Sequence, residues 1–243
     1  MEDFLSVRRL SKRFSGVRAL EEVDVDVRQG EVLGLVGPNG SGKTTLFNCV
    51  TGFVRATTGR VAWCGRDITG LAPDQIARLG IVRTFQQKMV FPNATVAENV
   101  RMTWRGANGD GLFPSCDALL DFLQLAPIGD KLATDIPFGY ARKLGLGLAL
   151  AACPRLLLLD EPAAGLNTEE SKELGVLIRR ITDLGVTVWI IEHDMNLVMA
   201  ISNRIVVLEA GRKIAEGEPA AIANDPAVIT VYLGEKFARR RTP

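Results

Sequence analysis

Hydrophobic positions along the chain follow two patterns that predict two kinds of strand. Segments in which apolar and polar residues alternate, as in half-buried antiparallel strands, lie at 4–10, 23–27 and 60–64. Continuous apolar runs, as in strands buried on both faces of a parallel sheet, lie at 31–36, 155–159 and 186–191. Shorter strands are expected at 81–85, 204–208 and 212–215. With helical patterns between these runs, the sequence predicts an α/β fold with a mainly parallel sheet and an antiparallel β subdomain.

Residues from about 88 to 150 interrupt this alternation, because their pattern is mostly helical. Thr95 has the position of an N-cap before a helix at 96–104, and a second amphipathic helix is expected at 116–125. We therefore expect an inserted helical subdomain in this region. A C-terminal helical extension is expected at about 217–243, and the chain is interpreted as a single unit of 1–243.

Composition narrows the classes of function. The 243 residues are 47% hydrophobic and 23% charged with a net charge of +1, which is typical of a soluble α/β protein. Basic residues are scattered up to the terminal run 239–241, so no nucleic-acid groove is predicted. That run is interpreted as a solvated tail, with contact to phospholipid or RNA as the alternative. The four cysteines have no C-x-x-C spacing and are interpreted as buried free thiols of a reducing compartment. No signal-peptide pattern opens the chain, and the longest apolar stretch, 144–153, is too short for a membrane span.

A glycine-rich loop joins the apolar run 31–36 to a helical pattern, and it reads Gly37-Pro38-Asn39-Gly40-Ser41-Gly42-Lys43-Thr44-Thr45. This is the spacing of a phosphate-binding loop, in which inward backbone N–H groups and the following helix N-terminus meet the phosphates. Lys43 is expected to reach the β and γ phosphates, and the Thr44 hydroxyl to hold Mg²⁺. A plain glycine turn is the alternative, and the Lys-Thr pair at this offset favours nucleotide binding.

Two further buried strands end in polar residues, and ligands of open parallel sheets bind at that edge. Asp160 and Glu161 follow the run 155–159, where Asp160 is expected in the Mg²⁺ shell and Glu161 as the base for an attacking water. Two adjacent acids would repel each other without a cation, which also favours Mg²⁺ over a simple turn. His193, the only histidine, follows the run 186–191 and is expected to contact the γ-phosphate rather than to be structural.

Two other residues are weaker candidates. Gln86 follows the strand at 81–85 and is predicted to join Mg²⁺ or the attacking water. Phe14 lies in an expected turn at 12–16, where stacking on an adenine ring and packing beneath the loop are both open alternatives.

Together these residues resemble the ATP-binding cassette of ABC transporters over residues 4–235. The resemblance implies a P-loop NTPase fold, ATP and Mg²⁺ as cofactors, and a head-to-tail dimer with a second cassette. It also implies that Phe14 is the adenine-stacking aromatic, Gln86 belongs to the Q-loop, Glu161 is the catalytic base and His193 is the switch histidine. Asn167 would then lie in the D-loop.

A closer resemblance, to the branched-chain amino acid uptake group, rests on four segments: 83–86, 160–167, 192–195 and 231–235. It implies an importer ATPase that acts with hydrophobic permease subunits and, indirectly, with an extracytoplasmic solute-binding protein. The subunit would be peripheral, at the cytoplasmic face of the inner membrane. Urea or short amides are alternative substrates, because importers for them share much of this pattern. Phe91 is a candidate permease contact, with packing inside the subdomain as its alternative.

The family signature, usually LSGGQ, is altered here to Ile136-Pro137-Phe138-Gly139-Tyr140. Gly139 is retained and is expected to contact ATP held by the opposite subunit. Pro137 replaces serine and Tyr140 replaces glutamine, which predicts a weakened partner site. Gly145 and Gly147 are unusual in the following helix, since a glycine inside a helix costs about 1 kcal/mol relative to alanine.

Other classes of function fit less well. A soluble ABC ATPase acting on ribosomes or DNA would carry two cassettes or a long coiled coil, and this chain has neither. A non-hydrolysing regulatory nucleotide module is permitted by the altered signature, but Glu161 and His193 disfavour it. Small-molecule kinases share the phosphate loop, but their function gives no reason for Glu161 and His193 at these positions.

Overall fold

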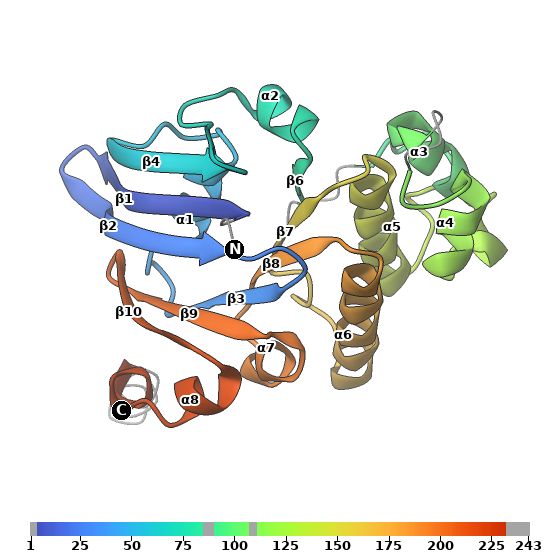
Figure 1. Cartoon of the computed structure of the whole chain (residues 1–243). Helices are drawn as coiled ribbons and strands as arrows, with labels where there is room; N and C mark the ends of the chain where they lie inside the picture. Colours follow the sequence, from blue (N-terminus) through green and yellow to red (C-terminus); the bar gives the residue numbers. More distant parts are fainter. Residues whose placement is uncertain (1–3, 85–89, 107–110, 232–243) are drawn as a thin grey trace.

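Two sheets and a group of helices make up the molecule in a computed structural model, which describes residues 4–84, 90–106 and 111–231 (Figure 1). The larger sheet has six strands in the order β10-β9-β3-β8-β7-β6. Its strands are β3 Val32–Val36, β6 Ile81–Arg83, β7 Leu156–Asp160, β8 Thr187–Ile191, β9 Arg204–Glu209 and β10 Arg212–Gly217. All pairs in it are parallel except β9 with β10, so the predicted mainly parallel sheet is confirmed.

Strand β7 shows why continuous apolar runs form the centre of this sheet. Its alternate side chains belong to different hydrophobic clusters, Leu156 and Leu158 to one and Leu157 and Leu159 to the other. Because successive side chains of a strand point to opposite faces, both faces of β7 need apolar residues. The first cluster also contains residues of the antiparallel sheet and of helix α1 (Lys43–Val50), which joins the two sheets into one core.

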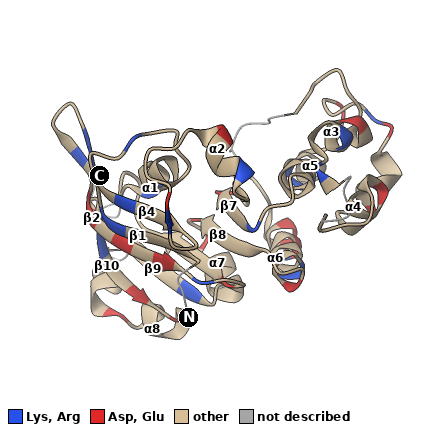
Figure 2. Cartoon of the chain, turned by 45° about the horizontal axis from the view of Figure 1, so that its top comes forward, with Lys and Arg blue, Asp and Glu red and all other residues tan. Residues whose placement is uncertain are grey.

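The second sheet is antiparallel, with strand order β2-β1-β4-β5. Its strands are β1 Leu5–Phe14, β2 Val17–Val27, β4 Thr58–Trp63 and β5 Arg66–Asp67. The turn expected at 12–16 is smaller than predicted, because β1 continues to Phe14 and pairs with β2 up to Val17. Acidic and basic side chains are interspersed on these strands (Figure 2), and some form exposed pairs such as Arg9–Glu22, 2.6 Å apart.

Most helices cover the second hydrophobic cluster. Helices α3, α4 and α5 lie together at one end of the molecule (Figure 1). The helices are α2 Pro73–Arg78, α3 Val96–Thr103, α4 Cys116–Phe122, α5 Phe138–Ala151, α6 Thr168–Asp183, α7 Met195–Ile201 and α8 Pro219–Ala223, with a 3₁₀ turn at Ala126–Ile128. Thr95 is the N-cap of α3, as predicted, and forms a capping box with Glu98.

The four cysteines differ more in their exposure than the sequence suggests. All are free thiols, but only Cys49 is buried; Cys64 is exposed, and Cys116 and Cys153 are partly exposed. The prediction of four buried thiols is therefore wrong for three of them. Burial raises the pKa of Cys49 to about 11, so this thiol is protonated and unreactive at neutral pH.

The expected C-terminal extension is helical at α8 and again at 226–231. Residues 232–243, with the terminal arginines 239–241, lie outside the described part of the chain. Among the described residues, no helix combines the length and the apolar content needed to cross a bilayer.

Candidate functional site

The carboxyl ends of three neighbouring strands meet at one edge of the large sheet. Leu35 of β3 is paired with Ile191 of β8, and Ile191 is paired in turn with Asp160 of β7. The residues that follow these strands are therefore brought side by side. They are the glycine loop, Glu161 and the pair Glu192-His193, as the sequence predicts.

The loop between β3 and α1 needs glycine where the backbone passes other backbone closely. Gly37 and Gly42 have φ angles of +149° and +103°. A Cβ at Gly37 would lie 2.1 Å from the carbonyl oxygen of Leu208, and one at Gly42 would lie 2.5 Å from that of Ala19. Larger residues at either position would push the loop away from the strands that support it.

Lys43 is folded into this loop. Its side-chain Nζ donates hydrogen bonds to the carbonyl oxygens of Gly37, at 2.7 Å, and Pro38, at 2.9 Å. Only 7% of the residue is exposed. The ammonium thus lies inside the curl of the loop, where it can meet an anion bound there.

The N-terminus of α1 is suited to an anion. Its cap is Gly42, which supplies no side-chain acceptor, and the first turn contains no acidic residue. The first N–H groups of a helix have no intrahelical partner and carry the positive end of its dipole. Asn39, Gly40 and Thr44 are exposed beside them, Thr45 is half-buried, and the buried hydroxyl of Ser41 has no hydrogen-bond partner among the described residues.

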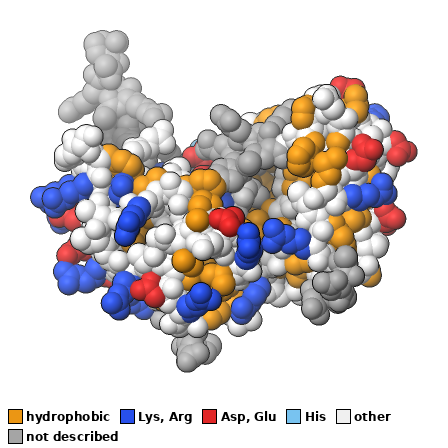
Figure 3. Space-filling model, turned by 90° about the horizontal axis from the view of Figure 1, so that it is seen from above, with side chains coloured by type: hydrophobic (Ala, Val, Ile, Leu, Met, Phe, Trp, Pro, Cys, Tyr) orange, Lys and Arg blue, Asp and Glu red, His pale blue; other side chains and the backbone are white. Residues whose placement is uncertain are grey.

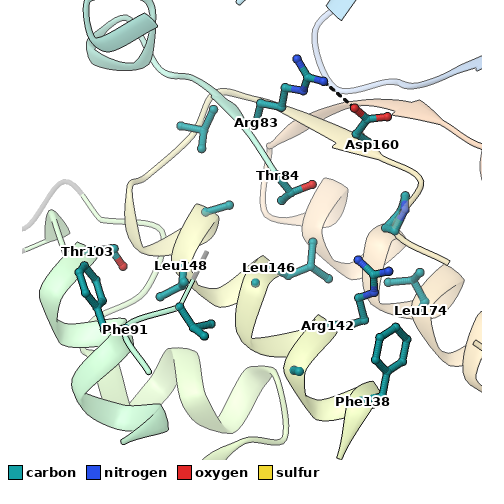
Figure 4. A pocket seen from close by; sticks show the side chains of 16 residues that line it. Arg83, Thr84, Phe91, Thr103, Phe138, Arg142, Leu146, Leu148, Asp160 and Leu174 are labelled. Carbon is teal, nitrogen blue, oxygen red and sulfur yellow. Dashed lines mark hydrogen bonds and ion pairs between the residues drawn. The ribbon is translucent and has the colours of Figure 1, made fainter. Parts of the chain in front are cut away.

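Asp160 is buried, and its two carboxylate oxygens have different surroundings. Oδ2 accepts a hydrogen bond of 2.5 Å from Arg83, and both side chains are only 5% exposed (Figure 4). Oδ1 has no hydrogen-bond partner among the described residues. The open oxygen is the kind of group that a divalent cation binds.

Arg83 is a site residue to which the sequence analysis assigned no role. Besides Asp160, its guanidinium donates a 2.6 Å hydrogen bond to Asn48 on α1, so it ties β6, β7 and α1 together. It also corrects the argument that the adjacent acids require Mg²⁺, because Arg83 already supplies a buried positive charge. In the sequence Arg83 ends a predicted strand and opens the segment 83–86, but neither feature indicates its partners.

Glu161 turns the chain sharply away from the end of β7. Its φ angle is +48°, a left-handed conformation that costs a residue other than glycine about 1–3 kcal/mol. Its backbone N–H donates a 2.9 Å hydrogen bond to the carbonyl oxygen of Ile191 on β8. The half-buried side chain therefore starts from a strained turn at the same edge as Asp160.

His193 and Phe14 are both open to solvent. The His193 side chain is 63% exposed, while its backbone N–H donates to Oε2 of the buried Glu192 at 3.1 Å. Phe14 is 44% exposed at the end of β1, with Lys12 Nζ 4.6 Å from its ring centroid. This exposure favours stacking over packing beneath the loop, and stacking on adenine stays a prediction. Gln86 lies outside the described residues.

A pocket of about 390 Å³ lies between the sheet edge and helices α3 and α5 (Figure 4). Asp160 and Arg83 line it on one side, and Phe91, which is 49% exposed, lines it on the other. Several exposed hydrophobic side chains belong to this helical part: Phe91, Met102, Leu132, Phe138 and Tyr140. Hydrophobic side chains gather on the right-hand side of the face seen in Figure 3, over the helical part. The exposure of Phe91 argues against the alternative that it packs inside the subdomain.

Comparison with known proteins identifies the family. Residues 20–164 match the ABC transporter family. The chain belongs to this family. Residues 212–238 additionally match the family described as "Branched-chain amino acid ATP-binding cassette transporter".

Several curated relatives of this cassette cover nearly its whole length. It is 40% identical to the high-affinity branched-chain amino acid transport ATP-binding protein LivG of Salmonella typhimurium, over 96% of this chain and 99% of that protein. The high-affinity branched-chain amino acid transport ATP-binding protein BraF of Pseudomonas aeruginosa is also 40% identical, over 95% of this chain and 98% of that protein. A probable LivG of Archaeoglobus fulgidus is 37% identical over 95% of each chain.

Solved structures agree with the fold. The cassette matches a crystal structure of an ATP-binding cassette of an ABC transporter in its ADP conformation, with a TM-score of 0.86 and 30% identity over 96% of this chain and all of that one. A cassette of the cbiONQ transporter complex of Clostridium perfringens matches with a TM-score of 0.82 and 25% identity, over the whole of both chains. The fold is a P-loop NTPase, and the chain is an ATPase of this family. Subunits of this kind dimerise, act with membrane permeases and are peripheral to the membrane.

The altered signature of the cassette lies at the start of α5. Pro137 is the N-cap of this helix and provides no side-chain hydrogen bond. A Cβ on Gly139 would lie 3.3 Å from Oε1 of Glu170, a tight contact, and Tyr140 is exposed. The two unusual glycines differ: a Cβ at Gly145 would meet nothing within 4 Å, whereas one at Gly147 would lie 2.8 Å from Leu123.

Proposed function

We propose that this cassette binds and hydrolyses ATP to power an importer of branched-chain or other hydrophobic amino acids. The observation that carries the proposal is the meeting of the Lys43 loop, the Asp160-Glu161 pair and His193 at one sheet edge. The match of residues 212–238 and the names of the relatives support the substrate class.

In this proposal the glycine loop and the N-terminus of α1 hold the phosphates of ATP. The Nζ of Lys43 exchanges its backbone carbonyl partners for the β and γ phosphates, and Phe14 stacks on the adenine ring. Thr44 and the open Oδ1 of Asp160 would hold Mg²⁺, which would supply positive charge to neutralise the phosphates. Gln86 is the further predicted ligand.

The proposed hydrolysis uses two side chains that follow neighbouring strands. Glu161 accepts a proton from the attacking water, and His193 contacts the γ-phosphate and orients that water. The strained turn at Glu161 supports this role, because such conformations persist where the surrounding structure enforces them at a functional site.

We further propose that the cassette works as one half of a dimer, in which Gly139 contacts ATP held by the opposite subunit. Exposed Phe91, beside the pocket next to Asp160, is the proposed contact with a permease subunit. The assembly would lie at the cytoplasmic face of the inner membrane and receive its substrate from an extracytoplasmic solute-binding protein.

The test is ATP-driven uptake into proteoliposomes that contain this cassette, the membrane subunits that co-purify with it and their solute-binding protein. We expect uptake of radiolabelled leucine by the wild type and none by Lys43→Ala, which loses the phosphate-binding ammonium. Uptake of urea or a short amide without leucine would contradict the substrate class. Binding of ATP with no co-purifying membrane subunit would instead contradict the role in transport.

A further inference from the structure

Glu192, between β8 and His193, is a buried carboxylate that the catalytic roles above do not use. Only 1% of it is exposed. Its Oε1 accepts a 2.7 Å hydrogen bond from the backbone N–H of Ala163, and its Oε2 accepts one of 3.1 Å from that of His193. Its ion-pair contact among the described residues is with the exposed imidazole of His193, at 3.9 Å.

Burial of this carboxylate costs free energy of desolvation, so its presence here needs a structural or functional reason. Desolvation raises the pKa of Glu192 above its usual value, although the N–H groups of Ala163, His193 and Asp194 lower it in part. A neutral or apolar side chain would avoid this cost. The carboxylate offers two strong acceptors in one side chain, and here each one serves a different loop of the site.

The two loops joined in this way carry Glu161 and His193. Ala163 lies in the turn 161–166 that begins with Glu161, and the Glu161 N–H is itself bonded to Ile191, next to Glu192. The same turn is tied to the signature helix α5, because Arg142 Nη2 donates a 3.0 Å hydrogen bond to the carbonyl oxygen of Ala164.

The other side of His193 is held to the same region. Asp194 caps α7 through the N–H groups of Asn196 and Leu197. Its Oδ2 accepts a 3.2 Å hydrogen bond from the hydroxyl of Ser171 on α6. The backbone of His193 is thus anchored on both sides to residues 163–171, while its imidazole remains exposed.

We propose that Glu192 is a positioning residue, which fixes the backbone of His193 to the turn that follows Glu161 and so keeps the imidazole at the nucleotide edge. This inference rests on the proposed function, in which His193 contacts the γ-phosphate. A displacement of about 1 Å at such a group lowers turnover by up to about 100-fold. Glu192 acts through His193 and touches no reacting atom.

Glu192→Gln is the direct test, because it keeps the volume of the side chain but replaces one acceptor oxygen with an N–H donor that would face a backbone N–H. Glu31→Gln is the control for the loss of a buried carboxylate away from the site. Glu31 is also buried and also accepts a backbone N–H, from Arg28 at 2.7 Å, and it is paired in addition with Arg204, at 2.7 Å, but it precedes β3 at the opposite end of the sheet.

The experiment measures kcat and KM for ATP hydrolysis by the full chain, in its assembled transporter where needed, for Glu192→Gln, His193→Ala, the double variant and Glu31→Gln. We expect Glu192→Gln to lower kcat by about 10- to 100-fold with KM within about twofold, and Glu31→Gln to leave kcat unchanged. The double variant is expected to be no slower than His193→Ala, because both changes act through one group.

Two results would overturn the inference while leaving the proposed function in place: an unchanged kcat in Glu192→Gln, or losses that multiply in the double variant. An unchanged kcat in His193→Ala would refute the role of His193, and the positioning role would fail with it. If Glu192→Gln does not fold, amide hydrogen exchange of the wild-type chain tests whether Glu192 holds the backbone N–H groups of Ala163 and His193. Slow exchange at both Ala163 and His193 would support the link, and fast exchange at either would overturn it.

Discussion

At the scale of single residues, the candidate site depends on polar groups whose partners come from distant parts of the chain. Arg83 and Asp160 are 77 positions apart and form a buried pair, which leaves one oxygen of the carboxylate open. Glu192 likewise reaches Ala163, 29 positions away. In both cases a buried charge orients a group at the sheet edge, so precise placement of the site comes at the cost of desolvation.

Arg83→Met should strongly destabilise the cassette, because it leaves the carboxylate of Asp160 buried without its ion pair. We expect a loss of about 3–5 kcal/mol in the free energy of unfolding, measured by urea denaturation. Arg9→Met is the matched control, since the Arg9–Glu22 pair has side chains that are 73% and 61% exposed. Its loss of stability should be far smaller, because an exposed ion pair is screened by solvent. Equal losses in the two variants would contradict this account of Arg83.

At the scale of elements, α5 combines the altered signature with two glycines in its interior. The helix packs against α3 and α4 within the second hydrophobic cluster. Only Gly147 has a packing reason, its approach to Leu123, whereas Gly145 faces open space beside the pocket. The structure gives no packing reason for Gly145.

Alanine substitutions should separate the two glycines. Gly145→Ala should stabilise the cassette by up to about 1 kcal/mol, because alanine is the better helix former and its methyl group meets no neighbour. Gly147→Ala should destabilise it by about 1–3 kcal/mol, because the added methyl group would overlap Leu123. Thermal unfolding of both variants checks this. A stabilising Gly147→Ala would show that Leu123 can move aside.

Restoring the signature should raise ATPase turnover in the assembled transporter. The variant combines Pro137→Ser with Tyr140→Gln and returns the polar groups expected to complete the partner's nucleotide site. Serine at 137 would also supply the side-chain N-cap that α5 lacks, which is worth about 1 kcal/mol. Pro137→Ser alone is the control for this gain in stability. Unchanged turnover in the double variant would show that the altered signature does not limit the rate.

At the scale of the whole molecule, most of the fold follows from local patterns in the sequence. Continuous apolar runs predict β3, β7 and β8. Because parallel strands end at one edge of a sheet, the sequence also predicts that Lys43, Asp160 and His193 lie close together. Local patterns could not find the partners of buried charges, because the contacts of Arg83 and Glu192 depend on strand order and register. For the same reason, the exposure of Cys64 could not be inferred from its apolar neighbour Trp63 in the sequence.

The central claim, that this cassette hydrolyses ATP with Glu161 as the base, is tested most directly by comparing the ATPase rates of the wild type and Glu161→Gln. Nucleotide binding and size-exclusion chromatography in Mg-ATP are measured alongside. A positioned general base contributes about 10²- to 10⁴-fold, so the variant should bind ATP, form the ATP-dependent dimer and lose nearly all hydrolysis. A variant that kept half of the wild-type rate would contradict the assignment.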